Sequence, residues 1–354
     1  YDVPLLMQAE ELDTVVLDKL GLSKKQSPKL DNWKAFLERL KNPKNTVKIG
    51  LIGKYVELKD AYKSISEAFI HAGVANETKV ELNWIHSETL DPDNIANELE
   101  GLDGILVAPG FGSRGIDGKI EAVRYARENN IPFLGICLGM QIAVIEFARN
   151  VLGLSDAHST EMSENTTAPV ISMMEEQKRI SNMGGTMRLG AYKCELKPNS
   201  NTAKAYQNNN ISERHRHRYE FNNHYLADYE ANGMIAAGKN PDTNLVEVVE
   251  IPAHPWFVGV QYHPEYKSTV DAPHPLFVAF VKAALKNNEF KFPGKEITVN
   301  MAPADIRKEG SVFDLPIAIG ILAVSEQVKA DHLSDYLMIG ELSLDGSVQA
   351  TKGI

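Results

Sequence analysis

The sequence is poor in cysteine, has no long apolar run and shows no excess of basic residues. Cys137 and Cys194 are the two cysteines among 354 residues, too few for a disulfide framework, so a reducing compartment is expected. No apolar run reaches the roughly 18 residues of a membrane span, and the first residues lack the basic and apolar regions of a secretory signal. These absences predict a cytoplasmic protein that does not bind a membrane.

Acidic residues outnumber basic residues by 47 to 37, which gives a net charge of −10. A chain this acidic is not expected to coat nucleic acid or anionic lipid. Its one basic run, RHRHR at residues 214–218, has no aromatic residues between the charges. We therefore interpret this run as part of a site or a domain contact rather than as a nucleic-acid interface.

The residue pattern changes near positions 46 and 289, and the length alone predicts two or three domains. Residues 1–45 hold two short apolar stripes at helical spacing, with a linker between them. Residues 46–288 alternate between strand-like and helix-like segments, which predicts an α/β fold with a parallel sheet covered by helices on both faces. Within them, residues 155–240 are irregular and predict loops and short antiparallel strands, whereas residues 289–354 start a new unit.

A candidate nucleophile lies where a predicted strand meets a predicted helix. Residues 135–139 read GICLG, the thiol counterpart of the G-x-S-x-G nucleophile elbow, at the carboxyl end of a strand, where such sheets bind ligands. The glycines permit a sharp turn at Cys137, and the N-terminus of the following helix favours a thiolate there. A buried structural cysteine is the alternative, but the strand–helix junction favours the nucleophile.

A cysteine nucleophile needs a base and a group that orients this base. His263-Pro264-Glu265 follows the predicted strand WFVGVQY. Residues two apart in a strand share a face, so we expect the carboxylate of Glu265 to hold the imidazole of His263. An isolated turn histidine is the alternative, but the upstream GICLG motif favours a catalytic pair.

Acyl transfer also needs hydrogen-bond donors for an oxyanion. The geometry of an elbow makes the N–H of Leu138 one donor. Residues 108–112, APGFG, follow another predicted strand, and Gly110 is expected to supply the second N–H because Pro109 has none. A plain turn is the alternative for this loop.

The motifs PGFG, GICLGMQ and QYHPE, in this order and spacing, resemble the class I glutamine amidotransferases. Over about residues 1–288, segments such as GKYVELKDAYKSISEA and ERHRHRYEFNN are similar to the C-terminal glutaminase domain of the CTP synthase family. This resemblance implies a flavodoxin-like α/β fold. It also implies that L-glutamine is hydrolysed to glutamate and ammonia through a cysteine thioester.

The resemblance also implies roles for individual residues. Cys137 would attack the glutamine amide, His263 would transfer the proton and Glu265 would orient His263, with no metal or cofactor. Many family members have V-P-G-G-F-G where this chain has V-A-P-G-F-G, so the oxyanion hole here is expected to rest on Gly110 and Leu138. The glutamine pocket is expected to contain the residues of two motifs together with an ammonium-binding glutamate and a carboxylate-binding arginine: Gly110, Phe111, Leu138, Gly139, Met140, Gln141, Glu161 and Arg218.

In the family, a synthetase (amidoligase) domain precedes the glutaminase, uses UTP, ATP and Mg²⁺, responds to GTP as an activator and forms a homotetramer. Residues 1–45 resemble only the end of that domain and its linker, and no phosphate-binding G-x-x-x-x-G-K-[ST] loop occurs before residue 46. We therefore expect no CTP formation from this chain alone. Two alternatives stay open, a stand-alone γ-glutamyl cysteine hydrolase of the same fold and a chimera whose glutaminase is idle without its synthetase domain.

Residues 289–354 resemble part of the N-terminal domain of magnesium-chelatase-like, competence-type AAA ATPases, which has an S5/Lon-like α+β fold. Asp314 falls where Lon-type proteases carry their nucleophilic serine, so no protease activity is expected. No ATPase activity is expected either, because the sequence stops at KGI before any Walker loop. The segment AALKNN, at residues 283–288, fits the sequence pattern of both families, the glutaminase and the magnesium-chelatase-like ATPases. A shared segment at the junction favours a chimera formed by recombination or assembly over a selected fusion.

We predict that the tail beginning near Glu289 is dispensable for glutamine hydrolysis, because a piece this short buries little core. Truncation after Asn288 should leave kcat/KM for glutamine unchanged, and limited proteolysis should cut first between residues 287 and 295. A protease-resistant tail, or loss of activity on truncation, would show that the two parts form one unit.

Overall fold

The computed structural model describes residues 1–22, 29–173, 187–287, 313–324, 333–336, 338, 340–342 and 348–349. The chain divides into two compact units, Tyr1–Leu285 and Lys286–Ile354. The three segments expected from the sequence, 1–45, 46–288 and 289–354, stay a prediction. The expected start of the tail (289–312) and most of its expected cleavage region (288–295) lie outside the described residues.

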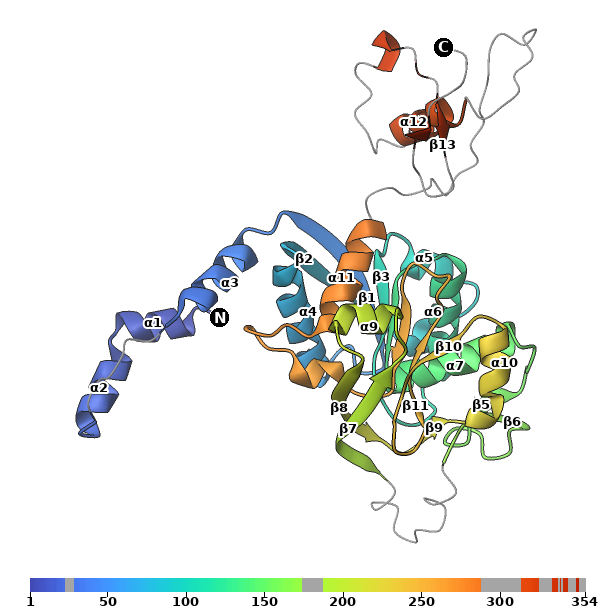
Figure 1. Ribbon diagram of the computed structural model, residues 1–354, viewed down its shortest axis with the longest axis horizontal. Helices are drawn as coiled ribbons and strands as arrows, with labels where there is room; N and C mark the ends of the chain where they lie inside the picture. Colours follow the sequence, from blue (N-terminus) through green and yellow to red (C-terminus); the bar gives the residue numbers. More distant parts are fainter. Residues whose placement is uncertain are drawn as a thin grey trace. The chain divides into compact units, whose positions relative to one another are not determined.

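A central sheet of nine strands runs through the described part of the first unit (Figure 1). Five neighbouring strands are parallel, in the order β2 (Thr78–His86), β1 (Asn45–Gly53), β3 (Gly104–Val107), β4 (Phe133–Ile136) and β12 (Phe257–Val260). Four antiparallel strands continue the sheet, in the order β11 (Val246–Glu250), β10 (Ile235–Lys239), β7 (Arg188–Leu196) and β8 (Asn210–His217). The carboxyl ends of β3, β4 and β12 therefore meet at one end of the parallel half, where the sequence places its candidate site.

The antiparallel half is larger than the sequence predicts. Short strands were expected for residues 155–240, yet β7 has nine residues and β8 has eight. Strand β8 buries Glu213, His215 and His217 and exposes the residues between them. A buried face made of polar side chains leaves no apolar alternation in the sequence, which is why these strands were underestimated.

Both faces of the sheet carry an apolar core, which confirms the predicted α/β fold with helices on two sides. Along β3, Ile105 and Val107 belong to one cluster of buried residues and Leu106 belongs to the other, as the alternation of a strand requires. Two helices supply much of each cluster: α6 (Ile116–Glu128) and α7 (Leu138–Asn150) for the first, α4 (Lys63–Ala75) and α11 (Pro275–Asn287) for the second.

The remaining described elements are short, and no described helix has both the length and the apolarity needed to cross a bilayer. Helix α3 packs on α4 through Phe36, Leu37 and Val74. In the first unit these elements are α1 (Val3–Ala9), α2 (Leu12–Lys19), α3 (Asp31–Lys41), η1 (Lys59–Tyr62), η2 (Ser87–Thr89), α5 (Ile95–Leu99), α9 (Asn201–Tyr206), η4 (Asn223–Tyr225), α10 (Leu226–Ala231), η5 (Pro264–Lys267) and a small sheet of β5 (Ala157–Ser159), β6 (Ala168–Ser172) and β9 (Glu220–Phe221). In the second unit they are α12 (Asp314–Val324), η7 (Leu333–Asp335), β13 (Glu341–Leu342) and β14 (Val348–Gln349).

Substitution of Gly118 should destabilise the first unit, because α6 lies directly against η2 at this residue. A Cβ on Gly118 would lie 1.9 Å from the carbonyl oxygen of Ser87 and 3.0 Å from Leu90 Cβ. We expect Gly118→Ala to lower the free energy of unfolding by about 2 kcal/mol or more, measured by urea denaturation followed by far-UV circular dichroism. Lys282→Ala, at an exposed position of α11, is the control. Equal midpoints for the two variants would contradict the packing described here.

Candidate active site

Cys137 lies in a strained turn between β4 and α7. Its backbone has φ 52° and ψ −102°, which side-chain-bearing residues rarely adopt. The residues on both sides of the turn are glycines, because neighbouring backbone atoms leave no room for a side chain at either position. A Cβ on Gly139 would lie 2.2 Å from the carbonyl oxygen of Val107, and one on Gly135 would lie 2.7 Å from the backbone of Gly139. The structure therefore builds the elbow that the GICLG motif predicts.

The imidazole of His263 is held by Glu265. Their Nδ1 and Oε1 atoms are 2.8 Å apart, and both residues are buried. Burial lowers the pKa of His263, but the interactions of the imidazole with Cys137 and Glu265 outweigh burial and raise this pKa to about 11. Tyr266 stacks on the imidazole, with ring centroids 5.3 Å apart. The structure thus brings together Cys137, His263 and Glu265 and favours the protonated form of the imidazole.

The sequence predicts that His263 and Glu265 share one face of a strand, and this explanation of their pairing is wrong. Strand β12 ends at Val260, and Glu265 belongs to the 3-10 turn η5. It is this turn, which begins at Pro264, that folds the carboxylate back onto the imidazole. The backbone N–H of His263 donates to the carbonyl oxygen of Arg214 at 2.8 Å, so β8 fixes the start of the turn.

The two residues expected to supply the oxyanion donors, Gly110 and Leu138, lie close together. A Cβ on Gly110 would lie 3.5 Å from Leu138 Cδ2 and 3.9 Å from Lys119 Nζ. The carbonyl oxygen of Phe111 accepts a hydrogen bond from Lys54 Nζ. The loop of residues 108–112 is therefore held against the first turn of α7, with Gly110 beside Leu138.

Glu161 and Arg218, the residues expected to hold the ends of glutamine, both lie near Tyr219. Burial and Glu161 raise the pKa of Tyr219, and Arg218 opposes them. Glu161 Oε1 also accepts a hydrogen bond of 3.0 Å from the N–H of Gly112, which ties it to the same loop as Gly110. Glu161 is therefore held against the loop of Gly110, and both charged residues act on Tyr219.

The expected pocket residues of α7 differ in whether their side chain or only their backbone can contact a ligand. Gln141 Nε2 donates to the carbonyl oxygen of Tyr219 at 3.0 Å and to Gln261 Oε1 at 3.2 Å. Gln261 Nε2 in turn lies 3.8 Å from the Cys137 sulfur. Met140 is fully buried and its side chain belongs to the apolar core, so only its backbone is available to the pocket.

Sequence reasoning missed Lys54, Lys119 and Gln261. Lys54 and Gln261 lie within the motifs GKYVELKDAYKS and QYHPE, but the sequence assigns a role only to other residues of these motifs. Lys119 lies in the first turns of α6, and an amphipathic helix usually exposes its lysines. No local signal shows that this lysine is buried.

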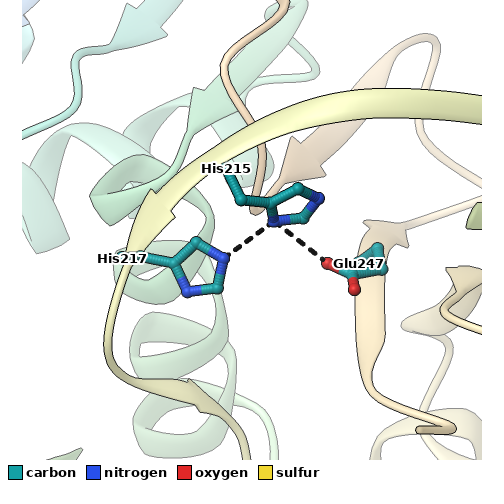
Figure 2. Close-up of side chains that lie close together, drawn as sticks. All are labelled: His215, His217 and Glu247. Carbon is teal, nitrogen blue, oxygen red and sulfur yellow. Dashed lines mark hydrogen bonds and ion pairs between the residues drawn. The ribbon is translucent and has the colours of Figure 1, made fainter. Parts of the chain in front are cut away.

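A buried network of Arg188, His215, His217, Glu220 and Glu247 lies beneath β8, and it contains the one group of potential metal ligands found among the described residues. Figure 2 shows His215, His217 and Glu247 pointing toward one another. One potential ligand atom of each lies within 4.8 Å of the others. However, His215 Nδ1 and His217 Nε2 are 2.8 Å apart. Two nitrogens on a tetrahedral ion with bonds of ~2.0 Å are separated by about 3.3 Å. Arg188 also binds Glu247 at 2.9 Å and Glu220 at 3.1 Å, so the arrangement is a hydrogen-bonded charge network.

Burial sets the ionisation of this network. Burial and the charge of Arg188 lower the pKa of His215 to about 3, and burial also lowers the pKa of His217. Burial raises the pKa of Glu220 to about 8 and raises the pKa of Glu247, although Arg188 opposes both shifts. The guanidinium of Arg188, on β7, joins β9 and β11 through Glu220 and Glu247. His215 and His217, on β8, lie 3.6 Å from Glu247 and 3.4 Å from Glu220 and bring that strand into the network.

Comparison with known proteins gives two family matches. Residues 57–283 match the family model described as glutamine amidotransferase class-I, and residues 279–354 match the family model described as subunit ChlI of Mg-chelatase. The first match covers more than half of the chain.

Relatives of known name are similar to the same region. The CTP synthase of Flavobacterium johnsoniae is 64% identical over 285 residues, which cover 80% of this chain and 53% of that protein. The CTP synthase of Cytophaga hutchinsonii is 65% identical over 284 residues, with the same coverage of 80% and 53%. The chain thus spans about half the length of the curated relatives it matches. Among solved structures, the glutaminase domain of Trypanosoma brucei CTPS with bound acivicin is 40% identical, with a TM-score of 0.65, over 70% of this chain and 97% of that one.

His215 should make a defined contribution to the stability of the protein that is lost in acid. Its folded pKa of about 3 lies below the unfolded value of ~6.5, so the unfolded chain binds more protons between these values. Stability from this group is complete above pH ~6.5 and decreases as the pH falls. Relative to His215→Asn, the wild type should lose about 2 kcal/mol of unfolding free energy between pH 7 and pH 5, measured by urea denaturation. Parallel pH curves for the two proteins would contradict the assignment.

Proposed function

Because the chain belongs to the class I glutamine amidotransferase family, we propose that it hydrolyses L-glutamine to glutamate and ammonia as the glutaminase part of a CTP synthase. One observation carries the proposal: the strained elbow presents Cys137 to the His263–Glu265 pair. The high identity to CTP synthases and the likeness to a CTPS glutaminase domain support it.

Hydrolysis begins with the thiolate of Cys137, whose proton has passed to His263. The sulfur attacks the side-chain amide carbon of glutamine, and the N–H groups of Leu138 and Gly110 stabilise the resulting oxyanion. The imidazolium of His263 then gives its proton to the leaving nitrogen, which departs as ammonia and leaves a γ-glutamyl thioester. In the second half, His263 takes a proton from water, the hydroxide attacks the thioester, and glutamate leaves as the thiol is restored.

The charged groups near Tyr219 select an amino acid as the substrate. Arg218 offers a fork of N–H donors to the α-carboxylate, and Glu161 offers a carboxylate to the α-ammonium. Glu161 also binds the N–H of Gly112, so substrate recognition and the Gly110 loop are coupled. We expect glutamine without its α-charges to be a poor substrate for this reason.

The wider context is proposed on the same basis. In a CTP synthase the ammonia would be used to convert UTP to CTP by a synthetase domain that binds ATP and Mg²⁺, responds to GTP and forms a homotetramer. No step of glutamine hydrolysis at Cys137 requires these ligands. We place the protein in the cytoplasm, which fits its two unpaired cysteines. The match of residues 279–354 to a magnesium-chelatase subunit supports a joined fragment of that family.

Substitution of the two cysteines should separate the nucleophile from a structural thiol. Cys137→Ser should lower glutamate release from glutamine by roughly 10³-fold or more, because a serine hydroxyl is far less ionised than a thiol. Cys194→Ser is the matched control. Cys194 lies on β7, where burial raises the pKa of its thiol, and its loss should leave turnover unchanged.

Each outcome of this experiment has a distinct meaning. Turnover that survives in folded Cys137→Ser protein would remove Cys137 from its role. Hydrolysis of γ-glutamyl peptides in preference to glutamine would favour the stand-alone hydrolase. A folded wild-type chain that releases no glutamate would favour the idle chimera.

A further inference from the structure

Lys119 is a fully buried amine at the edge of the candidate active site. Its side chain is not exposed, and its Nζ has no hydrogen-bond partner among the described residues. Burial, together with the charge of Lys54, lowers the pKa of Lys119 to about 7, and Cys137 opposes both effects. Buried lysines are rare unless they are paired with a carboxylate. Here the acidic group that acts on the amine is the thiol of Cys137.

The position of this amine relates it to the oxyanion hole. Nζ of Lys119 lies 3.9 Å from the point where a Cβ on Gly110 would stand, and Leu138 Cδ2 lies 3.5 Å from the same point. Gly110 and Leu138 are the two residues expected to donate N–H groups to the oxyanion. The amine is therefore packed against the Cα of Gly110, on the side where a side chain would point.

A second buried lysine supports the same loop. Lys54 is 6% exposed, and its Nζ donates to the carbonyl oxygen of Phe111, the residue after Gly110. Lys54 also has the carboxylates of Glu161 and Glu88 acting on it, whereas no carboxylate acts on the pKa of Lys119. Lys54 thus has a hydrogen-bond acceptor and carboxylates acting on it. Among the described residues, Nζ of Lys119 has no hydrogen-bond acceptor, and no carboxylate acts on its pKa.

Resting on the proposed glutaminase function, we propose that Lys119 is a positioning residue that supports the oxyanion hole from behind Gly110. Its ammonium form stabilises the negative charge of the Cys137 thiolate and of the tetrahedral intermediate, and it holds the Gly110 loop toward that charge. An unpaired amine would be costly to bury for packing alone, because a methionine fills the same volume without this penalty.

Lys119→Met tests the proposal, since it keeps the length of the side chain and removes its charge. Arg124→Met, which removes a charge from the same helix away from the site, is the matched control. We expect Lys119→Met to lower kcat by about 10- to 100-fold with little change in KM, and Arg124→Met to leave both unchanged. The wild-type kcat should fall as the pH rises through ~7, where Lys119 loses its proton, and this fall should be absent in Lys119→Met.

Alkylation of Cys137 by iodoacetamide gives a readout that does not depend on turnover. At pH 7 the Lys119→Met protein should be alkylated roughly threefold or more slowly at Cys137 than the wild type, because the thiolate loses a neighbouring positive charge. Cys194 is the internal control, because its buried thiol should stay unmodified as long as the protein is folded. If the wild type hydrolyses no glutamine, the proposed function fails, and the alkylation rates still decide the role of Lys119.

The proposal is overturned if folded Lys119→Met protein has the same kcat, pH profile and alkylation rate as the wild type. Lys119 would then be a packing residue. If the variant does not fold, the wild-type pH profile decides. A kcat that stays level from pH 6 to pH 9 would then overturn the proposal.

Discussion

The close approach of three backbone segments around Cys137 is the constraint on which the rest of the site depends. Strand β3 presses on the first turn of α7 at Gly139, and β12 presses on the same turn, where a Cβ on Gly259 would lie 3.2 Å from Met140 Cα. A strained backbone of this kind costs about 1–3 kcal/mol and persists only where the surrounding packing enforces it. The sheet supplies that packing, so Cys137 is positioned by the core of the protein.

Local motifs made much of the fold and the site predictable. The parallel strands, the elbow at Cys137 and the loop at Gly110 each follow from a short run of residues with a characteristic period or turn chemistry. The pairing of Glu265 with His263 was predicted with the wrong reason, because a proline-initiated turn and a strand both place residues two apart on one side. The family resemblance supplied Glu161 and Arg218, which no local pattern identifies.

Features that depend on distant residues could not be predicted from the sequence. Arg188 meets Glu220 and Glu247 across separations of 32 and 59 residues, and nothing near any of them in the chain indicates the others. The same is true of Lys119, which a helical pattern assigns to the surface. In both cases the sequence shows a charged residue and the tertiary structure determines whether water reaches it. Buried charge is therefore the property that sequence reasoning estimates least well in this protein.

Strand β8 is the last strand of the sheet, and the site covers its free side. The carbonyl oxygen of Arg214 accepts the N–H of His263, and the sulfur of Cys137 lies 4.0 Å from the carbonyl oxygen of Arg216. Both arginines are exposed on a strand that ends the sheet. Exposed edges invite pairing with strands of other molecules, and charged side chains discourage it. The residues to which we assign the chemistry therefore also cover an edge of the sheet, so a substitution that loosens the turn at His263 is expected to promote aggregation as well as to lower turnover.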